Sequence, residues 1–264
     1  MIKNHAAEFG PRLSSALRSL TLLTEFHLAI EGSYLSVLNG CTFPLLTTFS
    51  SIADLSPDWT PLSDFLARHP SITSLCLGGD SPGQNSPAGI PFDLPPRSLP
   101  ALTSYMGSRR LVSALIPSRP VRRVTLAWHA PNVEVEVACV IPPLALSSSL
   151  MQNFSVATPG WSSVLVRALA AYLPTLLSLR LYNTSSDYHN EVEIFKTLTD
   201  VLPVFTELTR LEIPCHRSIR SILAADAELH AAKAWASRAP RLQTVVFPSS
   251  RAWCRTDKSG WTLM

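Results

Sequence analysis

One short pattern recurs along the whole chain and constrains its fold more than any other feature. Its clearest copy is LPTLLSLRLYN, in which Leu176, Leu179 and Leu181 follow a proline at fixed offsets. Residues two apart in an extended strand lie on the same face, so Leu179 and Leu181 share one face and Arg180 occupies the other. The upstream proline ends a preceding helix and favours extended backbone. The pattern therefore predicts a helix followed by a half-buried strand.

Nine copies of the pattern align on their middle apolar residue, which we call the anchor. The anchors are Phe26, Phe49, Leu75, Tyr105, Val124, Phe154, Leu179, Leu211 and Val245, and the copies at Phe49 and Tyr105 are looser than the rest. Successive anchors are 19 to 34 residues apart. This spacing brackets the period of roughly 20 to 29 residues that is typical of leucine-rich repeats.

Helical patterns fill the segments between many of these strands. In residues 60–70, Thr60 can cap a helix whose inward positions extend from Leu62 to His69. Similar stripes occupy residues 161–174 and 190–203, and residues 218–240 give the longest stripe, with Leu229 among its inward positions. Residues 133–137 alternate like a strand, but two glutamates in a possible first turn favour a helix, which we predict.

These elements predict a single α/β domain over residues 1–264. Because a helix separates successive strands, the strands should be parallel and stack in sequence order. We expect an irregular leucine-rich-repeat-like solenoid, with a curved parallel sheet on the concave side and helices on the convex side. A Pro/Gly-rich insertion interrupts it at residues 79–98, and a D-K-S-G turn between two Trp-bearing runs predicts a capping hairpin at residues 251–264.

Composition argues against several classes of function. The net charge is +3 with scattered arginines, which does not favour nucleic-acid binding, and no apolar run is long enough to span a membrane. The five scattered cysteines favour no metal site, and we find no catalytic or cofactor-binding motif. Asp187 and His189 could pair beside Ser185 or Ser186, as in the catalytic triad of a hydrolase. Such residues are common in any polar turn, so chance explains them more readily than catalysis. The N-terminal residues lack the features of a secretory signal, which predicts a cytoplasmic or nuclear protein.

The candidate binding residues are those that alternate with the anchors and so point away from the core. They are Arg123, Thr125, Asn153, Ser155, Arg180, Tyr182, Arg210 and Glu212. Arg180 and Glu212 should lie on neighbouring strands and form an ion pair. This face is a candidate surface for a protein partner. The alternative is an ordinary solvated sheet face, since these positions hold few of the large aromatic residues typical of binding hot spots.

Three runs resemble the leucine-rich-repeat region of F-box-like proteins of mushroom-forming fungi. They are residues 99–128, LPTLLSLRLYN and PSSRAWCRTDKSGW. The resemblance implies a non-enzymatic protein–protein interaction module that recognises substrates for an F-box-type ubiquitin ligase. Residues 1–23 do not match an F-box, so the ligase adaptor is expected as a partner only if an F-box lies upstream. The alternative is a free-standing or degenerate repeat scaffold with no ligase link. The repeats also lack the consensus asparagine, so no asparagine ladder is expected.

Overall fold

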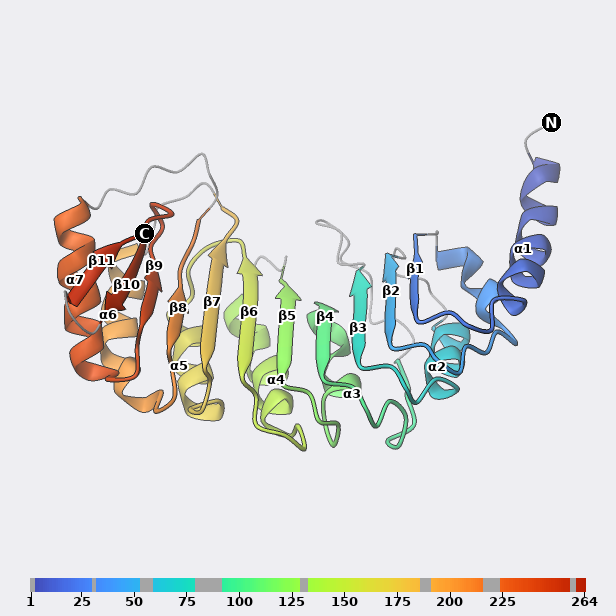
Figure 1. Cartoon of the computed structure of the whole chain (residues 1–264), viewed down its shortest axis with the longest axis horizontal. Coiled ribbons are helices and arrows are strands. Elements are labelled where there is room, and N and C mark those ends of the chain that lie inside the picture. Colours follow the sequence, from blue (N-terminus) through green and yellow to red (C-terminus); the bar gives the residue numbers. More distant parts are fainter. Residues whose placement is uncertain are drawn as a thin grey trace.

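The structure is a computed structural model that describes residues 3–29, 32–52, 59–78, 92–128, 133–185, 191–215, 224–256 and 260–264, with the backbone alone for residues 3–8, 32 and 33. In these residues, eleven strands form one open sheet whose spatial order is the chain order (Figure 1). The strands are β1 Glu25–Leu28, β2 Thr48–Ile52, β3 Ser74–Gly78, β4 Ser104–Ser108, β5 Arg123–Ala127, β6 Asn153–Thr158, β7 Ser178–Asn183, β8 Arg210–Glu212, β9 Thr244–Val246, β10 Ala252–Thr256 and β11 Gly260–Leu263.

The first nine strands are parallel, and each contains one of the nine predicted anchors. The anchors pair with one another from strand to strand, from Phe26 opposite Phe49 to Leu211 opposite Val245. All nine are buried. The predicted strands, their order and their register are therefore confirmed.

Seven α-helices lie in the described part of the chain. They are α1 Lys3–Arg18, α2 Thr60–Ala67, α3 Val112–Leu115, α4 Val133–Ala145, α5 Ser163–Tyr172, α6 Glu191–Val201 and α7 Ala225–Arg238; the 3₁₀ helices are η1 Gly32–Leu38, η2 Arg109–Leu111 and η3 Leu202–Val204. Figure 1 shows α2 to α6 behind the strands, on one face of the sheet, with α1 beyond β1 and α7 beside the last strands. The ambiguous segment at residues 133–137 is helical, as predicted. No helix in this described part is both long and apolar enough to cross a membrane.

The core lies between the helices and the sheet face that they cover. Near the N-terminal end, the rings of Phe26, Phe43, Phe49 and Phe65 contact one another, with centroids 4.9 to 6.4 Å apart. Near the C-terminal end, Phe195, Trp235 and Phe247 form a stack with centroids 5.4 to 6.1 Å apart. Such pairs are worth about 0.5–1.5 kcal/mol beyond the area they bury.

A second ladder joins the strands just before they begin. The backbone carbonyl two residues before each of the first eight anchors accepts two N–H groups from the next copy of the pattern; Thr24, for example, accepts from Thr47 and Thr48 at 2.8 and 3.1 Å. The hydroxyls of Thr47, Thr73, Thr103 and Thr209 donate to the same carbonyls at 3.0 to 3.2 Å. This threonine ladder was not predicted. It satisfies backbone groups that would otherwise need water.

The loose copy at Tyr105 has a steric explanation. Gly107 occupies an inward position where β1, β3, β5, β6 and β7 have leucine or valine, and a Cβ atom there would overlap the carbonyl oxygen of Leu77. The Tyr105 hydroxyl instead reaches this space and donates to the Ser108 carbonyl at 2.7 Å. The larger ring at the anchor therefore compensates for the missing side chain.

Some local predictions were wrong. Helix α2 begins at Thr60 with Trp59 at its cap position, so Thr60 is not the cap residue. In α7 the predicted inward residue Leu229 is half-buried and packs against the core, but the fully inward positions are Glu228 and Trp235, which were not predicted. The expected start of that helix, at residue 218, lies outside the described residues, as do residues 79–91 of the predicted insertion. The C-terminal hairpin is present as antiparallel β10 and β11.

Candidate partner-binding face

The face of the sheet opposite α2 to α6 has a hollow at its centre, across strands β4 to β8. The hollow has a volume of about 450 Å³ and is lined by Ser104, Arg123, Val124, Thr125, Asn153, Phe154, Ser155, Ser178, Arg180 and Glu212. Strand alternation places these polar side chains here, because the anchors beside them point into the core. The predicted residues Arg123, Thr125, Asn153, Ser155, Arg180 and Glu212 all line this hollow.

The register of the strands arranges the lining residues in two rows. One row contains Arg123, Asn153, Ser178 and Arg210, each opposite the next. The second row, two residues further along each strand, contains Thr125, Ser155, Arg180 and Glu212. In the first row, the short Asn153 and Ser178 lie between two arginines. In the second row, the short Thr125 and Ser155 are followed by the longer Arg180 and Glu212, so short side chains form the floor of the hollow and longer ones its edges. Arg210 flanks the hollow, and Tyr182 lies one step further along β7, outside its lining.

The predicted ion pair between Arg180 and Glu212 is confirmed. Arg180 Nε lies 3.4 Å from Glu212 Oε2, and Arg210 also pairs with the same carboxylate. The Glu212 side chain is 15% exposed, whereas those of Arg180 and Arg210 are 51% and 50% exposed. The two guanidinium groups therefore cover the carboxylate and remain open to solvent. Arg123 is exposed and has no acidic partner among the described residues.

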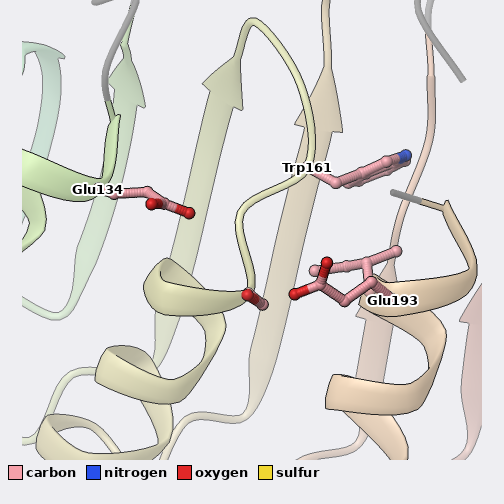
Figure 2. A pocket seen from close by; sticks show the side chains of 5 residues that line it. Glu134, Trp161 and Glu193 are labelled. Carbon is pink, nitrogen blue, oxygen red and sulfur yellow. The ribbon is translucent and has the colours of Figure 1, made fainter. Parts of the chain in front are cut away.

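A smaller hollow lies on the other side of the molecule, where helices α4, α5 and α6 begin. Its volume is about 30 Å³, and Glu134, Trp161, Ser163, Glu193 and Ile194 line it. Figure 2 shows the Glu134 and Glu193 carboxylates directed toward the space between them, with Trp161 above Glu193. A space of this size accommodates one or two water molecules and no larger ligand.

Sequence reasoning missed a buried glutamate near the C-terminal end. Glu228 is fully buried, and its Oε2 accepts hydrogen bonds from Trp253 Nε1 at 3.3 Å and Arg251 Nη1 at 3.2 Å. This carboxylate therefore joins α7 to the C-terminal hairpin. Trp235, seven residues further along α7, is the signal that could have found it, since a buried tryptophan defines the inward face of a helix.

Two groups near Glu228 have shifted pKa values. Burial raises the pKa of Glu191, and the negative charge of Glu228 raises it further. Burial also raises the pKa of the Cys215 thiol, and the negative charge of Glu191 raises this pKa further. Oε1 of Glu191 and Oε1 of Glu228 are buried without a hydrogen-bond partner. None of the three residues Glu191, Cys215 and Glu228 lines the central hollow.

His69 is buried at the other end of the core, at the predicted inward position. Its Nδ1 lies 2.6 Å from the Phe65 carbonyl, and Phe43 N–H donates to its Nε2 at 2.8 Å. These partners require a neutral ring with the proton on Nδ1. Burial lowers the pKa of His69 accordingly.

The described residues assemble no group of three or more His, Cys, Asp or Glu side chains in positions to bind a metal ion. Asp187 and His189, which lie near serines in the sequence, fall outside the described residues. No protein-family model matches the chain, and no curated protein matches it in sequence. The functional assignment therefore depends on the geometry of the uncovered sheet face.

Proposed function

We propose that this chain is a protein-interaction module with leucine-rich-repeat-like architecture, which binds a protein partner on the uncovered face of its sheet. The proposal is supported by nine parallel strands in sequence order, each with its anchor in one continuous ladder. Repeat proteins of this kind stack small units and use the extended strand face for binding. Binding needs no enzymatic activity.

The hollow at the centre of the uncovered face is the observation on which the proposal depends most. It spans five neighbouring strands, and its polar lining comes from the rows that alternate with the anchors; the anchors Val124 and Phe154 complete the lining. A surface of this shape holds its polar side chains on rigid strands, which reduces the entropy lost when a partner binds.

In the more specific form of the proposal, the chain recognises substrates for an F-box-type ubiquitin ligase. The resemblance of residues 99–128 and of the C-terminal hairpin to F-box-like proteins supports this form. The competing form is a free-standing scaffold without a ligase link. Co-purification of the ligase adaptor with the chain expressed together with its upstream genomic sequence separates the two, because only an F-box receptor retains the adaptor.

Site-specific photo-crosslinking tests the binding face. A benzophenone amino acid at position 155, on the floor of the hollow, should form crosslinks with a partner protein from cells of the source organism. The matched control places the same amino acid at position 167, which is exposed on α5 in the helical layer. Equal crosslinking from both positions, or crosslinking from position 167 alone, would contradict the proposed function.

A further inference from the structure

We propose that the central hollow binds an extended acidic segment of the partner, whose carboxylate side chains pair with Arg123, Arg180 and Arg210. This inference rests on the proposed function, because it specifies the chemistry of the ligand for the same face.

The charges around the hollow favour an anionic ligand. Three arginines and one glutamate surround it, which gives a formal net charge of +3 − 1 = +2. The single carboxylate, on Glu212, is covered by two guanidinium groups that are each about half exposed. A ligand that approaches this face therefore meets guanidinium N–H donors before it meets the carboxylate. Arginine donors match the planar carboxylate in charge and geometry.

The spacing of the arginines suits an extended peptide that crosses the strands. Arg123 and Arg210 lie in the same row on strands β5 and β8, so three strand spacings, about 14 Å, separate their backbones. An extended peptide advances about 3.4 Å per residue, and the side chains of every second residue point to the same side. Acidic residues four positions apart would therefore match both arginines.

The floor of the hollow provides partners for the peptide backbone between these charges. Asn153, Ser155 and Ser178 lie between the two ends of the rows and are half-buried. Their hydroxyl and amide groups can donate to carbonyls and accept from N–H groups of a crossing chain. Their small size leaves the room that the backbone of the ligand needs.

A nucleic-acid ligand fits these observations less well. Proteins that bind single strands stack bases on exposed aromatic side chains. The one aromatic residue in the described lining is Phe154, which is 1% exposed and points into the core. Three arginines are also fewer than the six to ten phosphate contacts, approximately, that dominate affinity for a nucleic-acid backbone.

Fluorescence anisotropy with defined probes tests the inference. The probes are a fluorescein-labelled twelve-residue peptide of alternating Glu and Ser, its counterpart of alternating Gln and Ser, and a labelled twelve-nucleotide oligothymidine. The full chain should bind the Glu/Ser peptide at least about tenfold more tightly than the Gln/Ser peptide at low salt. Arg123→Ala should weaken that binding about fivefold, the limit for one exposed ion pair.

Charge reversal supplies the matched control. Arg123→Glu should weaken binding of the Glu/Ser peptide by about tenfold or more, whereas Arg167→Glu, with the same change of charge on α5, should change it less than about twofold. Equal affinity for the two peptides would overturn the inference, as would tighter binding of oligothymidine. Neither outcome alters the crosslinking from position 155, so the acidic ligand can fail while the binding face stands.

Discussion

Alanine substitutions at two adjacent residues of β7 should have very different effects on stability. Leu179 is an anchor with no exposed surface, and it pairs with Phe154 and Leu211 on either side. Leu179→Ala removes buried methyl groups and leaves a cavity in a rigid ladder, which costs about 2–5 kcal/mol. Arg180 is half exposed, and its ion pair with Glu212 contributes about 1 kcal/mol at most.

Urea unfolding followed by circular dichroism measures both variants. The unfolding midpoint should fall much further for Leu179→Ala than for Arg180→Ala, with the slope against urea unchanged. Leu211→Ala, at the neighbouring anchor, should behave like Leu179→Ala. Equal losses at positions 179 and 180 would refute the alternation on which the assignment of the two sheet faces depends.

Three further predictions concern stability. Gly107→Ala should destabilise the chain by more than about 2 kcal/mol, because the new Cβ meets the Leu77 carbonyl. Gly10→Ala, in open space on α1, should be neutral or stabilising, and thermal unfolding of the two variants compares them. The pKa of His69 is lowered, so its contribution to stability is present above the unfolded value of about 6.5 and lost as pH falls below it; His69→Gln should remove that part of the pH dependence of unfolding. The pKa of Glu191 is raised, so the stability from its protonated form is lost as pH rises through the pKa of the folded state. Glu191→Gln should therefore raise the melting temperature at pH 8 and have little effect at pH 3. The control variant Glu193→Gln should not show this difference between the two pH values.

The sheet was predictable because its signal is local and repeated. Each copy of the pattern specifies an inward and an outward face by alternation alone, and nine copies with one register leave little freedom in the order of strands. The ion pair between Arg180 and Glu212 follows directly from this register. The six predicted residues that line the hollow were likewise defined by their offset from the anchors.

The unpredicted features depend on contacts between distant segments. Glu228 is buried because Arg251 and Trp253, more than twenty residues later, supply its hydrogen bonds. A buried carboxylate without such partners would be strongly unfavourable, so its own segment suggests an exposed position. Leu229 packs against the core as predicted, but an isolated helix pattern does not reveal that the neighbouring Glu228 is the more deeply buried residue.

The threonine ladder was missed for a different reason. Thr47, Thr73, Thr103 and Thr209 stand two residues before their anchors, but threonine is common at strand starts and suggests no particular partner. The carbonyl that each hydroxyl contacts belongs to the preceding repeat. This role becomes visible once the repeats are stacked.

The affinity of the Glu212→Gln variant for the Glu/Ser peptide tests the central claim most directly. The substitution keeps the shape of the side chain but removes the one carboxylate that Arg180 and Arg210 share. If the uncovered face holds acidic segments between its arginines, the variant should bind the peptide about threefold to tenfold more tightly than the wild-type chain, because two guanidinium groups lose their internal partner. Unchanged or weaker binding would contradict this assignment of the face.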